Sequence, residues 1–167
     1  MRHRAVNYIL QQYLYYPMSQ EDTDMKTISE FMKNEHHSCD KAFAAAEMAS
    51  SGGNWDLAEN AFEQFRNAMA RHFHMEEDKL FPMLLAAGGP DGPVQVMHME
   101  HAQMNALIEE MADALSHRDV QRYGGQSETL LIVMQQHNLK EEQMLYPIAD
   151  HFLTSQREAL LSSFQSA

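Results

Sequence analysis

Apolar side chains recur along most of the chain every three or four residues, which is the spacing that one face of an α-helix requires. Sustained alternation of apolar and polar residues, the pattern typical of strands, is lacking, and β-branched residues are scarce. Turn-forming residues interrupt the helical pattern at 50–54 (SSGGN), at 86–93 (AAGGPDGP) and, more weakly, at either 117–119 or 124–125. The pattern predicts four helices, over roughly 24–49, 55–86, 93–117 and 119–153.

Short connections between long helices make consecutive helices antiparallel neighbours. We therefore predict an all-α fold, an up-down-up-down antiparallel four-helix bundle over residues 25–153, with short N- and C-terminal extensions. Residues 1–24 are expected to form an N-terminal arm or an extra helix. Pro17 would end any helix there. Residues 154–167 are expected to form a short C-terminal helix. The length of 167 residues is that of one domain.

The second and fourth predicted helices end in the same motif. Residues 71–84 read RHFHMEEDKLFPML, and residues 136–149 read QHNLKEEQMLYPIA. Both contain H-x-x-x-E-E-x-x-L-[FY]-P, and the histidines that begin them, His72 and His137, lie 65 residues apart. One His and Glu four residues apart is common on helix surfaces, whereas two copies that extend to a proline at the same offset indicate an internal repeat. The repeat predicts two equivalent places in the fold.

The spacing within the motif suits metal binding. Residues four apart lie roughly 40° apart around a helix and one turn along it, so both side chains can reach one ion. Two such helices facing each other supply two His and two Glu, half of a dinuclear site in which carboxylates bridge and imidazoles are terminal ligands. Burying these groups without compensation would cost roughly several kcal/mol. A bound metal would offset this cost.

The apolar stripes of these helices indicate which side chains face inward. On the second helix the stripe runs through Phe62, Phe65, Met69, His72, Glu76 and Leu80. On the fourth it runs through Leu130, Met134, His137, Glu141, Met144 and Ile148. Glu142 shares a face with Gln135 and Asn138 and is predicted to be solvated. Glu77 lies between Phe73 and Phe81, so its place is left open behind Glu76.

The first and third helices should each present a histidine at the same depth. The stripe of the first helix passes through His36, whereas His37 lies on a polar face. The stripe of the third passes through His101, whereas His98 aligns with Asn105 and Glu109 and is left open as a spare ligand. The predicted metal ligands are therefore His36, His72, Glu76, His101, His137 and Glu141. The remaining histidines are expected at the surface.

Composition narrows the classes of function. The chain holds 10 His and 14 Met, and its net charge is −12, which argues against nucleic-acid partners and anionic membrane surfaces. No stretch approaches the roughly 20 apolar residues of a membrane span. The N-terminal apolar run makes a poor signal peptide, so a cytoplasmic location is expected. The single cysteine, Cys39, cannot form an internal disulfide and is expected to act as a small buried hydrophobe.

The donor set favours certain metals. Six N and O ligands are too many for structural zinc, which takes four, whereas mixed imidazole and carboxylate ligands suit iron or manganese. Shared between two ions, six ligands leave open positions on each ion. Dioxygen, nitric oxide or an oxo bridge could bind there.

Four stretches of the sequence resemble the hemerythrin-like HHE cation-binding family: EHHSCD (35–40), HFHMEEDKLFP (72–82), GPVQVMHMEHAQM (92–104) and HNLKEEQMLYP (137–147). The resemblance covers about residues 25–153. It implies a di-iron centre, oxo- or hydroxo-bridged, in which manganese could replace iron. The family's ligand positions fall on the same six residues that the helical stripes select.

The sequence departs from the animal oxygen carriers of this family. Those proteins use five His, with a His pair four residues apart on the third helix and an Asp five residues after the His of the fourth. Here Met97, Asn105 and Glu142 stand at the corresponding positions. The pattern of four His and two Glu is more similar to bacterial di-iron proteins linked to iron–sulfur cluster repair, which usually carry a further cysteine-containing domain that this sequence lacks.

Three hypotheses follow from the sequence. The first is a non-haem di-iron protein that binds or senses dioxygen or nitric oxide, or that handles iron. The second is an enzyme or repair factor using the same centre, as an oxidase, a peroxidase or an iron donor. The third is an interaction bundle without metal. A metal- and gas-binding protein is favoured over an enzyme, and the oligomeric state is left open, with a homodimer as one candidate.

Overall fold

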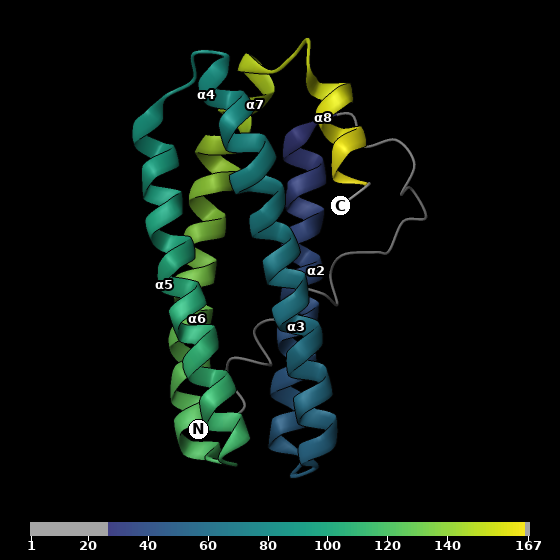
Figure 1. Ribbon diagram of the computed structural model, residues 1–167, viewed down its shortest axis with the longest axis vertical. Helices are drawn as coiled ribbons and strands as arrows, with labels where there is room; N and C mark the ends of the chain where they lie inside the picture. The colour runs from purple at the N-terminus through teal and green to yellow at the C-terminus, as the bar shows by residue number, and fades with distance from the viewer. Residues whose placement is uncertain (1–26, 166–167) are drawn as a thin grey trace.

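The computed structural model of the chain describes residues 27–165. All regular structure in that range is helical, as predicted, and it contains no strand. Four long helical stretches lie side by side, and a short helix follows them (Figure 1). They are α2 (Ile28–Ser51); α3 (Trp55–Met75) continued by η1 (Glu76–Leu80) and α4 (Phe81–Ala86); α5 (Asp91–Ser116); α6 (Val120–Lys140) continued by η2 (Glu141–Leu145) and α7 (Tyr146–Phe152); and α8 (Arg157–Phe164).

The stretches begin and end within a few residues of the predicted ranges. The third turn falls at 117–119, and Gly124 and Gly125 lie inside α6. The expected short helix near the C-terminus corresponds to α8. The arm or extra helix expected over residues 1–24 lies outside the described residues.

Short turns join consecutive stretches at alternating ends of the molecule (Figure 1). Helix α2 packs along α3, and α5 packs along α6. Contacts of α3 with α5, and of α2 with α6 and α7, connect these two pairs. The two copies of the sequence repeat, at the ends of α3 and α6, therefore come from different pairs and face the same interior.

Polar caps define where the stretches begin. Thr27 and Glu30 form a reciprocal capping box at the start of α2, with the Glu30 amide donating to Thr27 Oγ1 at 3.0 Å. Asn54 caps α3 by accepting from the Leu57 amide. Asp119 caps α6 in the same way, by accepting from the Arg122 amide. Arg118, in the turn before it, has a positive φ of 55°, in the left-handed region.

Each copy of the repeat contains one π-helical turn, η1 or η2. The amide of Phe81 donates to the carbonyl of Glu76, and the amide of Tyr146 to that of Glu141, five residues earlier in both cases. The proline that follows each of these residues has no N–H and cannot continue an ideal α-helical ladder. A π-turn adds a residue to the helix, so the side chains beyond it are rotated relative to an ideal α-helix.

This rotation corrects the face predicted for the end of the fourth helix. An uninterrupted helical period places Met144 and Ile148 in the core. Met144 is instead 41% exposed, and Ile148 is only partly buried. Leu145 and Tyr146 are fully buried in their place, because the extra residue of η2 advances the inward face by one position.

Two buried apolar clusters fill the interior on either side of a layer of His and Glu. One cluster lies toward the turns at 52–54 and 117–119 and includes Phe43, Phe62, Phe65, Met104, Ile108 and Tyr123. The other lies toward α4, α7 and α8 and includes Met32, Met75, Leu80, Met97, Leu145 and Tyr146. Apart from Tyr146, whose hydroxyl reaches the layer, the side chains named here offer the polar layer no hydrogen bonds.

No helix within residues 27–165 combines the length and the apolar character needed to cross a bilayer.

The carboxylate of Asp150 ties the end of the last long stretch to the start of the first. It accepts from the amides of Ile28 at 2.7 Å and Ser29 at 3.3 Å, and from the Ser29 hydroxyl at 2.6 Å. These bonds satisfy donors at a helix N-terminus that have no partner within the helix.

We expect Asp150→Ala to lower the free energy of unfolding by about 2 kcal/mol, because it removes this tertiary cap. Urea denaturation of the metal-free protein, followed by circular dichroism, measures the change. Glu158→Ala, which removes an exposed carboxylate from α8, is the control and should be near neutral. Equal stability of the two variants would contradict a stabilising role for the cap.

Candidate metal centre

All six residues predicted as ligands lie together in the polar layer. His36 comes from α2, His72 and Glu76 from the α3–η1 junction, His101 from α5, and His137 and Glu141 from the α6–η2 junction. Every one of these residues is at most 2% exposed. The structure thus brings all six together in the interior, from four helical stretches.

The histidines form two pairs of nearly identical geometry. The rings of His36 and His72 have centroids 4.8 Å apart and an interplanar angle of 65°. The rings of His101 and His137 have centroids 4.8 Å apart and an angle of 63°. In each pair one ring belongs to a copy of the repeat and the other to the helix packed beside it, so the sequence repeat is also a repeat in space.

Both inner carboxylates lie between the two histidine pairs. Glu141 Oε2 is 3.1 Å from the Nε2 atoms of His36 and His137. Glu76 Oε2 is 3.2 Å from Nε2 of His101 and 3.4 Å from Nε2 of His72. Each carboxylate therefore reaches both pairs, which is the placement that a bridging ligand of a two-metal site needs.

The pKa values of the two inner carboxylates, Glu76 and Glu141, are shifted in opposite directions. Burial raises the pKa of Glu76, and the neighbouring charge of Glu141 raises it further. Burial would also raise the pKa of Glu141, but hydrogen bonds from His137 and His36 outweigh it and hold that pKa well below its usual range. Glu141 therefore loses its proton more readily than Glu76 does.

The pKa values of His36 and His72 are also shifted in opposite directions. Burial would lower the pKa of His36, but its hydrogen bonds to Glu141 and Glu142 raise it to about 10. Burial, together with the charge on His36, holds the pKa of His72 well below its ordinary value. Without a cation, the layer balances its carboxylate charge by protonating some imidazoles and leaving others neutral.

Several buried polar atoms in this layer have no hydrogen-bond partner. They include Nε2 of His72 and Oε1 of Glu141. A buried unpaired polar atom costs about 1–3 kcal/mol, so such atoms are rare unless something else satisfies them. The donor atoms fall into two groups whose members lie within 4.8 Å of one another: His36, His72 and Glu141; and Glu76, His101, His137 and Glu141. Imidazole and carboxylate donors in these groups fit iron or manganese.

The profile of the hemerythrin HHE cation binding domain matches residues 27–149. The chain belongs to this family. The match spans all six clustered residues, and the cluster is compatible with cation binding. Neither the curated proteins nor the solved structures include a significant match to the chain.

In this hemerythrin domain a second set of carboxylates orients the inner histidines. The Nδ1–H of His36 donates to Glu142 at 2.8 Å, and that of His101 donates to Glu77 at 2.7 Å. The Nδ1–H of His137 donates to Glu100 at 3.0 Å. Carboxylates in this position fix the tautomer and ring orientation of metal-binding histidines.

The role of Glu142 corrects the expectation of a solvated side chain. It is partly exposed, but its carboxylate turns toward α2 and binds the buried His36. Glu77, left open at the sequence level, plays the same part for His101 and does not join the inner cluster. The second Glu of each Glu-Glu pair thus supports the histidine of another helix. The doubled glutamate in both copies of the repeat was the available signal.

The histidine pairs differ in this outer set. Glu100 immediately precedes His101 and binds both His137 and Lys140. Its counterpart is Glu35, which immediately precedes His36. Glu35 pairs with Arg71 at 2.9 Å, and Nδ1 of His72 is left without a hydrogen-bond partner. The approximate symmetry of the hemerythrin domain is broken at His72.

The other described histidines lie outside the cluster. His98 is 41% exposed and stacks edge-on against Phe81, with Nδ1 3.6 Å from Glu77. His37 is exposed, as the helical stripe indicated. Cys39 lies one turn from His36, and burial raises the pKa of its thiol to about 12, so it remains protonated and packs as a small hydrophobe.

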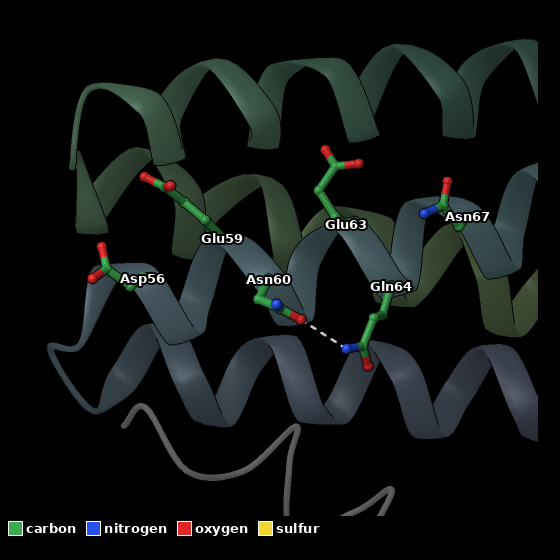
Figure 2. A pocket seen from close by; sticks show the side chains of 6 residues that line it. All are labelled: Asp56, Glu59, Asn60, Glu63, Gln64 and Asn67. Carbon is green, nitrogen blue, oxygen red and sulfur yellow. Dashed lines mark hydrogen bonds between the residues drawn. The ribbon is translucent and has the colours of Figure 1, made fainter.

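A surface hollow on α3 lies apart from this cluster. It is lined by carboxylate and amide side chains, and Figure 2 shows them on successive turns of the helix, with the Gln64 amide donating to Asn60 at 2.8 Å. None of the residues that line it belongs to the buried cluster. The candidate centre of the domain is therefore the buried layer.

We expect Glu142→Ala to weaken ferrous iron binding roughly 10- to 100-fold, because His36 loses the carboxylate that orients it. Anaerobic competition with a chromophoric chelator measures the affinity. Gln143→Ala, which changes the next and exposed residue of η2, is the matched control. Unchanged affinity in Glu142→Ala would support the solvated position inferred from the sequence.

Metal affinity should also depend on pH. The raised pKa of His36, about 10, means that Nε2 carries a proton at neutral pH, and an ion must displace it. Affinity for ferrous iron should therefore rise with pH between about 6 and 8, by up to tenfold per unit for this proton. Chelator competition across that range tests the slope. A flat profile would show that no proton is displaced.

Proposed function

We propose that the domain is an up-down-up-down four-helix bundle that holds two iron ions and binds or senses dioxygen or nitric oxide, or handles iron. The ligands in this proposal are His36, His72, Glu76, His101, His137 and Glu141. The observation that carries it is the convergence of four buried imidazoles and two buried carboxylates in one layer of a cation-binding family member. When bound, the ions would supply open coordination positions for a diatomic ligand.

The residues of the chain have separate parts in this proposal. The histidine pairs would each hold one ion, and Glu76 and Glu141, which reach both pairs, would connect the ions. Manganese could take the same places, since it accepts the same donors. The outer glutamates would keep the imidazoles in the orientation that ligation requires.

The enclosure of the layer supports a small ligand. Met32, Met75, Met97 and Met104 are at most 1% exposed and belong to the apolar clusters on either side of it. A diatomic, apolar molecule can pass between such side chains during their ordinary fluctuations, whereas a larger substrate would have to displace them. An apolar lining also limits access of water to the ions and thereby tunes them.

One observation favours a second candidate, an iron donor in the repair of iron–sulfur clusters. His72 has no acceptor at Nδ1, whereas His36, His101 and His137 each have one. An ion held by His72 would be bound through a less well oriented ligand and released more readily. Lability of one ion suits delivery of iron more than repeated binding of a gas.

Metal content of the protein tests the proposal. After growth with added iron we expect about two ions per chain, given the two donor groups. His101→Ala should remove most of the metal, because it deletes an inner ligand, whereas His98→Ala should retain it. Elemental analysis of the purified proteins measures both. Less than one transition metal per chain in the unaltered protein would overturn the di-iron assignment, and equal losses in the two variants would overturn the choice of His101.

Optical spectra separate the two candidates. The reduced, iron-loaded protein is exposed to oxygen and then returned to an oxygen-free atmosphere. A stable and reversible oxygenated species supports binding or sensing. Immediate and irreversible oxidation, accompanied by loss of one of the two ions to a chelator, supports catalysis or iron donation.

A further inference from the structure

The two copies of the repeat differ at one position beside the polar layer. Phe81 follows Glu76 by five residues, and Tyr146 follows Glu141 by the same number. The π-turns place both side chains in the interior, where Phe81 is 1% exposed and Tyr146 is fully buried. The second copy therefore adds one oxygen atom to the interior that the first copy does not supply.

The hydroxyl oxygen of Tyr146 lies among the donor atoms of the cluster. It is 2.8 Å from Oε1 of Glu76, 2.9 Å from Oε2 of Glu141 and 2.9 Å from Nε2 of His36. A phenol carries a single proton and can donate it to one of the two carboxylates at a time. Two carboxylate oxygens and one imidazole nitrogen therefore surround the phenol oxygen at nearly equal distances.

These distances match the spacing of ligands around one ion. Donor atoms about 2.1 Å from a metal and at right angles to each other lie about 3 Å apart. His36 Nε2 and Glu141 Oε2, both in the cluster, are 3.1 Å apart. The Tyr146 oxygen keeps the same spacing to both of them. It is placed as another member of the same donor group.

We propose that Tyr146 is a seventh metal ligand, which binds through its oxygen to the ion held by His36 and His72. The inference deepens the proposed function and rests on it. It adds Tyr146 to the smaller donor group of His36, His72 and Glu141, while Glu76 and Glu141 reach both histidine pairs.

The other half of the layer has an apolar counterpart. Phe81 stacks on His101 with ring centroids 5.9 Å apart, and Phe73 stacks on the same imidazole at 4.0 Å. Neither ring can bind an ion. Tyrosine ligation would therefore give the ion held by His36 and His72 one more protein ligand than the ion held by His101 and His137. The second ion would be the more open of the two to an added diatomic ligand.

A spectroscopic experiment tests this ligation directly. A phenolate bound to ferric iron absorbs visible light by charge transfer, and excitation in that band enhances the ring vibrations of the bound tyrosine in the Raman spectrum. The full chain is loaded anaerobically with ferrous iron, oxidised with ferricyanide, and analysed for iron and by resonance Raman. Tyr146→Phe is the test variant, and Tyr123→Phe, which alters a buried tyrosine in the apolar cluster away from the polar layer, is the matched control.

The expected result is a set of tyrosinate vibrations in the unaltered protein and in Tyr123→Phe, and their complete loss in Tyr146→Phe. Phe81 shows that a phenyl ring fits the equivalent position, so the variant should fold, which circular dichroism checks. A ferric protein with two ions but no tyrosinate vibrations would overturn tyrosine ligation and leave the di-iron proposal standing; Tyr146 would then only donate a hydrogen bond. Vibrations that persist in Tyr146→Phe would also overturn it, and a protein that takes up no iron would overturn both proposals.

Discussion

The interior of this protein depends on burying two carboxylates and four imidazoles between two apolar clusters. Met32, Met75, Met97 and Met104 offer these groups no hydrogen bonds, so the polar layer must satisfy itself or be satisfied by a cation. Part of the compensation comes from within, through contacts among His36, Glu141 and Glu142. This compensation is incomplete, because Nε2 of His72 and Oε1 of Glu141 have no hydrogen-bond partner. The free energy of metal binding and the stability of the fold are therefore linked.

The two copies of the repeat supply much of this polar layer. Each copy supplies an inner His, an inner Glu and an outer Glu, and the outer Glu orients a histidine of a helix outside its own pair. Approximate two-fold symmetry follows, visible in the matching geometry of the two histidine pairs. The departures from symmetry are local: Arg71 draws Glu35 away from His72, and Tyr146 replaces phenylalanine. These departures distinguish the two halves of the centre.

Helical periodicity predicted the all-α character, the approximate ends of the four stretches and the six inner residues, because each of these depends on which face of a helix is apolar. It did not predict the outer carboxylates. Glu142 and Glu100 sit on partly polar faces, and their partners are histidines distant in sequence, so only the packing of neighbouring helices reveals their contacts. Met144 was misplaced because a constant period of 3.6 residues cannot anticipate a π-turn.

The π-turns make the centre sensitive to spacing as well as to residue type. An ideal α-helix advances roughly 100° per residue, so removing one residue between Glu141 and Tyr146 would restore a regular helix and turn the phenol away from the layer. Replacing Gln143 or Met144, which are exposed, leaves that spacing intact. In relatives of this chain, the segment between the inner glutamate and the following proline should therefore vary freely in its exposed side chains while keeping its length. Insertions and deletions in that segment should therefore be rare among relatives.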